Sequence, residues 1–206
     1  MGMGVEQLVG LLAGASAAAA YEALGRRGDL DPAIAAQVTG AVCVGPAYTV
    51  SAPPHRSGSA NRALDLAPPG SVLVIDTGAD PDTCALGGTG SLAAQMRGLA
   101  GCVTNGRVRD LAEIRALRFP VFARGGTVRS SRKDGAAEFQ VPVAVGGQIV
   151  HPGDLVCADD DGVVVIGRQY FDTFAERLAA RLAFERDADA QVRAGASYAQ
   201  AVSGRP

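Results

Sequence analysis

Lysine and tryptophan are almost absent from this 206-residue sequence. Lys133 is the single lysine among nineteen cationic residues, the other eighteen being arginine, and there is no tryptophan. Catalysis through an imine needs a desolvated lysine. Lys133 stands between Arg132 and Asp134, in a context typical of an exposed turn. The composition therefore argues against imine chemistry.

Histidine and paired cysteine are scarce as well. His55 and His151 are far apart in the sequence. His151 precedes the turn Pro152-Gly153-Asp154, which favours a surface position, whereas His55 lies in a polar loop beside Arg56 that could reach a site, although we do not expect it to be catalytic. The cysteines form no Cys-x-x-Cys pair and have no histidine at zinc-site spacing. Three of them fall in apolar, strand-like runs, so buried thiols and a reducing, cytoplasmic setting are expected. The four are Cys43, Cys84, Cys102 and Cys157.

Charge and hydropathy exclude two further classes of partner. The formal net charge is −2, so the basic surface that nucleic acid requires is lacking. Residues 8–20 are apolar, but no basic segment precedes them and the run is too short to cross a bilayer. Their spacing predicts an amphipathic helix over about 5–24. We therefore expect neither a nucleic-acid partner nor a membrane anchor.

The pattern along the chain predicts a single α+β domain over residues 1–206. A core over about 40–166 follows the first helix, and a second long helix covers about 169–193. Residues 40–50 predict a strand interrupted at Gly45-Pro46, and 72–104 predict one parallel strand–helix–strand unit. Short apolar segments between 141 and 166 predict hairpins, including an Asp-Gly turn within Asp159–Gly162. The expected sheet is mixed, or closes into a flattened barrel.

Two stretches can carry chemistry. The first is the loop Gly87-Gly88-Thr89-Gly90, which precedes a predicted helix and offers free backbone N–H groups to a carboxylate or phosphate. The alternative is a tight turn that uses glycine for its backbone freedom.

The second stretch is Arg109-Asp110, at the end of an apolar strand. Arginine there can grip a carboxylate at two points, and aspartate can hold a hard divalent cation. The alternative is a helix start with Asp110 as its N-cap. The residues alone leave both stretches open between the two interpretations.

The order of these segments resembles the RraA-like family, which includes class II 4-hydroxy-4-methyl-2-oxoglutarate aldolases and oxaloacetate decarboxylases. The similar segments are VLVIDTG (72–78), the loop 87–90, NGRVRD (105–110), FPVFARG (119–125), VPVAVGG (141–147) and HPGDLVCADDDGVVVI (151–166). They cover about half of the chain. The resemblance implies an αββα-type sandwich that assembles as a homotrimer or homohexamer.

The resemblance also implies a site and a reaction. The backbone of Gly87, Gly88, Thr89 and Gly90, together with Arg109, would bind the pyruvyl group of a small 2-oxo acid. Asp110 would bind Mg²⁺ or Mn²⁺, and Glu185 of a neighbouring subunit's last helix would approach the site. The implied reaction is metal-dependent carbon–carbon cleavage through a pyruvate enolate, by retro-aldol cleavage of 4-hydroxy-4-methyl-2-oxoglutarate or by decarboxylation of oxaloacetate.

Three positions depart from the family pattern: Gly88 stands where an acid is frequent, Glu22 where aspartate is usual, and Arg107 where a small residue is common. One alternative function is therefore a diverged lyase with another acceptor. Another is a non-catalytic binding protein like the RNase E regulators, which lack the acid after the arginine. Asp110 favours the enzyme.

Overall fold

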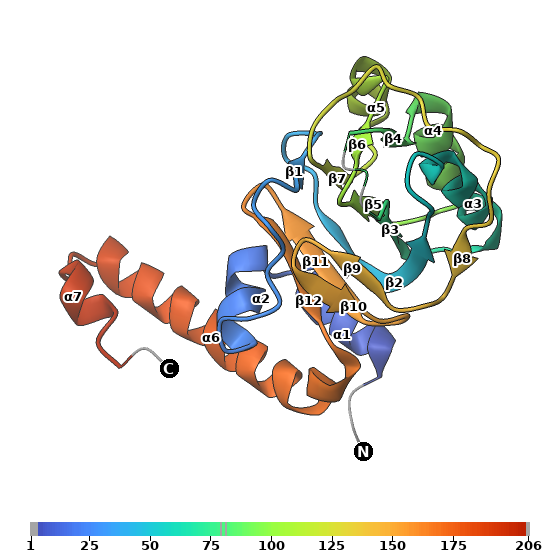
Figure 1. Ribbon diagram of the computed structural model, residues 1–206. Coiled ribbons are helices and arrows are strands. Elements are labelled where there is room, and N and C mark those ends of the chain that lie inside the picture. The colour runs from blue at the N-terminus through green and yellow to red at the C-terminus, as the bar shows by residue number, and fades with distance from the viewer. Residues whose placement is uncertain (1–3, 79, 81, 205–206) are drawn as a thin grey trace.

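The computed structural model describes residues 4–78, 80 and 82–204, which form four layers (Figure 1). The first layer holds the helices α3 (Ala63–Leu66), α4 (Gly88–Met96) and α5 (Leu111–Leu117). The second holds the strands β2 (Cys43–Ser51), β3 (Val72–Asp76), β5 (Gly101–Thr104) and β7 (Val121–Ala123). The third holds β9 (Val143–Val145), β10 (Gln148–Val150), β11 (Leu155–Asp159) and β12 (Gly162–Ile166). The last holds α1 (Val5–Leu12), α2 (Ala17–Ala23) and the long helix α6 (Phe171–Arg193).

Alternation of side chains along the strands produces these layers. In β3, Leu73 and Ile75 pack toward α3–α5, whereas Val72 and Val74 face the space between the two strand layers. In the third layer the even and odd positions of β11 and β12 divide in the same way, between the inner space and the helices α1, α2 and α6. Successive strand residues point to opposite faces. Strand β3 and the hairpin β11–β12 are therefore buried on both sides, whereas β9 and β10 expose Ala144 and Ile149 on their outer face. The predicted αββα arrangement is confirmed.

Strand β2 joins the two strand layers. Its first half pairs antiparallel with β11 and its second half, from Ala47, pairs parallel with β3. The predicted interruption at Gly45-Pro46 is wrong, because β2 is continuous and changes partner there. Pro46 has no N–H to donate, which is tolerated where the ladder changes. A Cβ at Gly45 would lie 2.3 Å from the Gly70 carbonyl oxygen, so glycine is needed for that close approach.

The mixed sheet runs in the order β1-β7-β5-β3-β2-β11-β12, with β8 also on β2. Here β1 is Ala35–Ala36 and β8 is Glu138–Phe139. The hairpin β11–β12 turns between Asp159 and Gly162, which confirms the Asp-Gly turn. Two short parallel strands stand apart from this sheet, β4 (Cys84–Leu86) and β6 (Arg107–Val108), and they carry the candidate site.

The N-terminal helix predicted over 5–24 is two helices, a correction with a local cause. Helix α1 ends at Leu12. The Ser16 side chain then accepts the Ala19 N–H at 3.0 Å and starts α2 as its N-cap. In the described part of the chain, no helix is long and apolar enough to cross a membrane.

The C-terminal helix agrees with its prediction. A short 3-10 turn at Arg168–Tyr170 leads into α6, which packs on α2 through Phe174 and Leu178. Its second half runs beyond the body of the molecule and ends in the small helix α7 (Tyr198–Ala201) (Figure 1).

All four cysteines are free and buried, as expected. Burial raises the pKa of the Cys102 thiol and of the Cys157 thiol to about 12, so both remain protonated at neutral pH.

Candidate active site

The glycine loop follows β4 and opens α4. Gly87 is the extended residue before the helix, and Gly88 is its first residue. None of the loop glycines has a positive φ, so backbone freedom does not explain them. The glycines are explained by lack of space for a side chain. A Cβ at Gly87 would lie 2.9 Å from Asp110 Oδ2, and one at Gly90 would lie 2.6 Å from a Leu86 methyl carbon. The glycines let the loop pack directly against Arg109-Asp110.

Parallel pairing of β4 and β6 brings the two predicted stretches together. Leu86 pairs with Val108, so the ends of both strands lie side by side. The Arg109 N–H then donates to the Leu86 carbonyl at 3.2 Å, and the Gly88 N–H donates to Asp110 Oδ2 at 3.1 Å. The carboxyl ends of parallel strands are where sites in α/β layers form.

Asp110 is not a conventional helix cap. Its side chain makes no capping hydrogen bond to α5, and its backbone is left-handed, with φ 62° and ψ 40°. A non-glycine residue in this region is uncommon and often marks a functional position. The carboxylate instead turns toward the start of α4, where partial positive charge and free N–H groups favour an anion. Asp110 therefore occupies the N-cap position of α5, as the alternative interpretation has it, but its side chain does not cap that helix.

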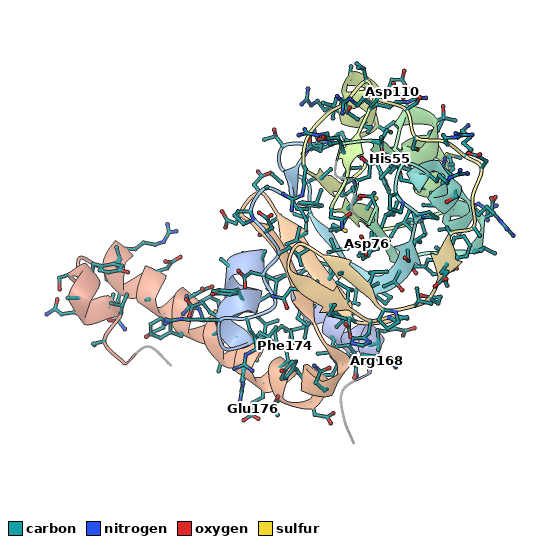
Figure 2. The ribbon with its side chains drawn as sticks, in the orientation of Figure 1. His55, Asp76, Asp110, Arg168, Phe174 and Glu176 are labelled. Atoms are coloured by element: carbon teal, nitrogen blue, oxygen red, sulfur yellow. The ribbon has the colours of Figure 1, made fainter. Side chains whose placement is uncertain are left out.

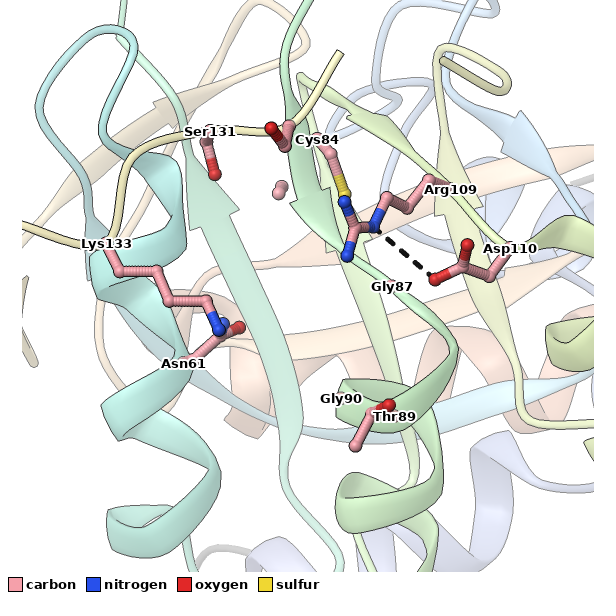
Figure 3. A pocket seen from close by; sticks show the side chains of 11 residues that line it. Asn61, Cys84, Gly87, Thr89, Gly90, Arg109, Asp110, Ser131 and Lys133 are labelled. Carbon is pink, nitrogen blue, oxygen red and sulfur yellow. Dashed lines mark ion pairs between the residues drawn. The ribbon is translucent and has the colours of Figure 1, made fainter. Parts of the chain in front are cut away.

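A cavity of about 230 Å³ opens beside this pair. Its lining residues are Asn61, Cys84, Ala85, Gly87, Thr89, Gly90, Arg109, Asp110, Ser130, Ser131 and Lys133. Figure 3 shows Arg109 and Asp110 on one wall, with Arg109 Nε 3.5 Å from Asp110 Oδ2, and Lys133 with Asn61 on the opposite wall. The cavity thus has a cation on each of two facing walls and one carboxylate.

Six of these lining residues were not predicted for the site from the sequence: Asn61, Cys84, Ala85, Ser130, Ser131 and Lys133. Lys133 is exposed, as predicted, but it lines the cavity together with Ser130 and Ser131 of the same loop. The backbone N–H of Arg132 donates to the His55 carbonyl at 3.0 Å, and Arg56 bonds Asp134 at 2.8 Å, which holds this loop in place. No local pattern marks the loop, because its position depends on partners more than seventy residues upstream.

Cys84 is the one cysteine on the cavity wall. Burial raises the pKa of its thiol, and the Sγ contacts the Leu86 carbonyl oxygen at 3.2 Å. A thiol held in its neutral form is a poor nucleophile, so Cys84 fills space.

His55 and Arg107 have partners other than the cavity. His55 Nδ1 lies 2.9 Å from the buried Asp80 carboxylate, whose pKa is held low in spite of burial by hydrogen bonds and by His55. The Arg107 guanidinium donates hydrogen bonds to the Asp82 carboxylate at 3.2 Å and to the Arg124 carbonyl at 2.9 Å, so it links two loops. Neither residue lines the cavity in the described structure.

Asp110 suits a hard divalent cation. One of its oxygens accepts the Gly88 N–H, and no hydrogen bond to the other is found within residues 4–78, 80 and 82–204. Within the same residues no cluster of three or more His, Cys, Asp or Glu could enclose a metal. Mg²⁺ characteristically uses one or two carboxylates and completes its shell with water and substrate oxygens. The residues present therefore fit Mg²⁺ or Mn²⁺ and do not fit a closed zinc site.

Glu185 lies away from the cavity within one chain. It sits on the projecting half of α6, and its carboxylate bonds Arg181 at 2.7 Å. Figure 2 shows Asp110 at the opposite end of the molecule from Phe174 and Glu176 of α6. A role for Glu185 in this site therefore requires a second subunit.

Comparison with known proteins gives one family and one fold. Residues 15–165 match the family model described as RraA-like: Aldolase/RraA. A Halalkalibacterium halodurans protein provisionally named 4-hydroxy-4-methyl-2-oxoglutarate aldolase is 40% identical over 123 residues, which are 60% of this chain and 59% of that protein. The chain therefore aligns with about three fifths of that relative's length.

Two solved structures have the same fold. An uncharacterized protein from Pseudomonas syringae pv. tomato has a TM-score of 0.86 at 28% identity, covering 98% of this chain and 94% of its own. Streptomyces coelicolor RraAS2, described as an unusual member of the RNase ES inhibitor RraA family, has a TM-score of 0.79 at 31% identity, with 91% and 98% covered. Because the family match runs from before α2 to within β12, this chain belongs to the RraA-like family.

Proposed function

We propose that this protein is a divalent-metal-dependent lyase that cleaves a carbon–carbon bond of a small 2-oxo acid and releases pyruvate. The juxtaposition of Arg109, the Asp110 carboxylate and the start of α4 around one cavity carries this proposal. The family's aldolase names support the class of reaction.

Arg109 and the glycine loop bind the pyruvyl end of the substrate. The guanidinium presents a planar set of donors that matches a carboxylate or an enolate oxygen. The free N–H groups at the start of α4 add positive potential on the same wall. Both are already ordered by the β4–β6 pairing, so little reorganisation is needed as negative charge develops on the 2-oxo oxygen.

Asp110 holds the cation. Its left-handed backbone directs the carboxylate to the loop side of the cavity, next to where Arg109 would place the 2-oxo and carboxylate oxygens. When bound, the metal acts as a Lewis acid that stabilises negative charge on the 2-oxo oxygen. Asp110 and Arg109 keep each other in place through their contact at 3.5 Å.

Lys133 and Asn61 face the distal end of the substrate. A cavity of about 230 Å³ admits a short chain, and a cation opposite Arg109 favours a second acidic group. The preferred substrates are therefore 2-oxo acids with a carboxylate at each end, such as oxaloacetate or 4-hydroxy-4-methyl-2-oxoglutarate. The amine of Lys133 acts here as a positive charge and hydrogen-bond donor.

We also propose that the protein is a homotrimer or homohexamer in which Glu185 of one subunit approaches the cavity of the next. The projecting half of α6 supports this, because a helix of 23 residues spans roughly 35 Å and only its first half packs on the body. A neighbour's carboxylate near Asp110 would accept protons from water or substrate at the reacting end.

Release of pyruvate from both acids tests the proposal. Purified protein is assayed with Mg²⁺ or Mn²⁺ and again with excess chelator. We expect metal-dependent release that is lost in Asp110→Ala and in Arg109→Ala. A matched control is Arg186→Ala, an exposed arginine on α6. Full activity of Asp110→Ala would refute the mechanism.

A second candidate is a binding protein of the RNase inhibitor type. The similarity to Streptomyces coelicolor RraAS2 favours it, since that protein is described as an unusual member of the RNase ES inhibitor RraA family. Two measurements separate the candidates. A binding protein would release no pyruvate from either acid and would lower the rate of an RNase E-type ribonuclease in a purified assay. The lyase would release pyruvate and would leave the ribonuclease rate unchanged.

A further inference from the structure

The space beside Gly88 is filled by a carboxylate from another helix. A Cβ at Gly88 would lie 2.0 Å from Glu113 Oε2 and 3.2 Å from the Asp110 Cβ. Gly88 has no positive φ, so its backbone would accept any residue. Glycine at this position is therefore explained by the Glu113 carboxylate, which takes the place of a side chain at the start of α4.

Glu113 and Asp110 both lie next to Gly88. Asp110 directly precedes α5 with a left-handed backbone and Glu113 is in the first turn of that helix, and both side chains come close to the same point beside Gly88. In the described part of the chain, Glu113 makes no hydrogen bond or ion pair. Two neighbouring carboxylates repel each other unless a cation lies between them.

Solvent space is present on the same side. A second hollow of about 300 Å³ is lined by Gly88, Thr89, Leu92, Glu113, Ala116 and Leu117. Thr89 also lines the cavity that holds Arg109 and Asp110, so the two hollows share this residue as a wall at the start of α4. A hydrated ion bound to Asp110 would therefore also lie near the Glu113 carboxylate.

We infer that Glu113 is a second carboxylate of the Asp110 cation site, and that Gly88 is glycine to leave room for it. The inference rests on the proposed function, because that function supplies the cation. Glu113 would bind the ion or one of its waters and would raise the affinity of a site that otherwise has a single carboxylate. Groups that hold metal-bound water or orient a ligand typically change affinity by roughly 10–100-fold.

A purely structural role for Glu113 is the alternative. An acid in the first turn of α5 interacts favourably with the helix start. Such a role would change the stability of the helix and would leave cation affinity unaltered. Cation affinity is therefore the readout that separates the two roles.

The test is Mn²⁺ binding to the full chain, measured by titration calorimetry and by electron paramagnetic resonance without substrate. The variants are Glu113→Gln, Gly88→Ala and the double variant. Glu176→Gln, an exposed glutamate on α6, is the matched control. We expect Glu113→Gln to weaken binding at least about tenfold. Gly88→Ala should weaken binding by displacing the Glu113 carboxylate, and should have no further effect in the Glu113→Gln background.

Two outcomes overturn the inference and they are distinguishable. If Asp110→Ala abolishes Mn²⁺ binding and Glu113→Gln binds like the parent protein, the cation site stands and Glu113 is not part of it. If the parent protein binds no Mn²⁺ and releases no pyruvate, the proposed function fails and this inference fails with it. Thermal unfolding of each variant, including Gly88→Ala at its buried position, shows whether the fold is intact.

Discussion

Replacing Asp110 separates the chemistry of the site from the stability of the fold. Its carboxylate accepts one hydrogen bond from Gly88 at 3.1 Å and lies 3.5 Å from Arg109 Nε, with both side chains partly exposed. Asn can accept the same hydrogen bond and, like Asp, tolerates the left-handed backbone. A hydrogen bond to a charged group contributes roughly 1.5–3 kcal/mol and a neutral one roughly 0.5–1.5. We therefore expect Asp110→Asn to lower the free energy of unfolding by about 1 kcal/mol.

The loss of function in Asp110→Asn is expected to be far larger. Removing the charge that holds the cation should lower metal-dependent pyruvate release at least about a hundredfold, equivalent to roughly 2.7 kcal/mol of transition-state stabilisation. Unfolding in urea gives the first quantity, and a coupled assay of pyruvate gives the second. Retention of more than a tenth of the parent rate by Asp110→Asn would refute the assignment of Asp110 to the cation.

Glycine and alanine at the same position test the backbone. Both remove the carboxylate, but only glycine adopts φ 62° without cost. Alanine in the left-handed region costs roughly 1–2 kcal/mol. Asp110→Ala should therefore melt about 2–4 °C or more below Asp110→Gly, as about 1 kcal/mol corresponds to about 2–4 °C in a chain of this size. Equal melting temperatures would show that residue 110 does not keep this conformation.

Further predictions concern the distal wall, the assembly and the buried thiols. Lys133→Gln should raise KM for oxaloacetate about tenfold while kcat changes little, because the distal carboxylate loses its cation; steady-state kinetics with an unchanged KM would contradict this. The variants Asp110→Ala and Glu185→Gln should each be inactive alone. Mixed oligomers of the two should recover about a quarter of the parent activity, because about a quarter of the shared sites then contain both Asp110 and Glu185. An absence of recovery in mixtures whose subunits are shown to exchange would count against shared sites. Burial raises the pKa of the Cys102 thiol and the Cys157 thiol from 9.0 to about 12, so their contribution to stability is complete below pH 9 and is lost as pH rises from about 9 to 12. Urea unfolding at several pH values should show this decline, and it should be reduced when both residues are alanine.

Much of the fold follows from periodicity in the sequence. Strand β3, the hairpin β11–β12 and the helix α6 lie where alternation, turn residues and helical spacing predict them. Where an element begins or ends depends on single residues whose effect varies with their surroundings. Pro46 predicts an interruption of the strand, yet β2 continues through it because its pairing partner changes there. Ser16 divides the first helix by capping a new one, a signal weaker in the sequence than the apolar run around it.

The candidate site divides in the same way. The sequence by itself determined the glycine loop and Arg109-Asp110 as chemically capable groups, because residue type and strand-end position are local properties. Only the tertiary structure decided that the Asp110 side chain does not cap its own helix, that Lys133 lines the cavity, and that Glu113 takes the space beside Gly88. These depend on the β4–β6 pairing and on loops that meet from distant parts of the chain. Contacts at that separation in sequence leave no periodic pattern, since packing alone brings the groups together.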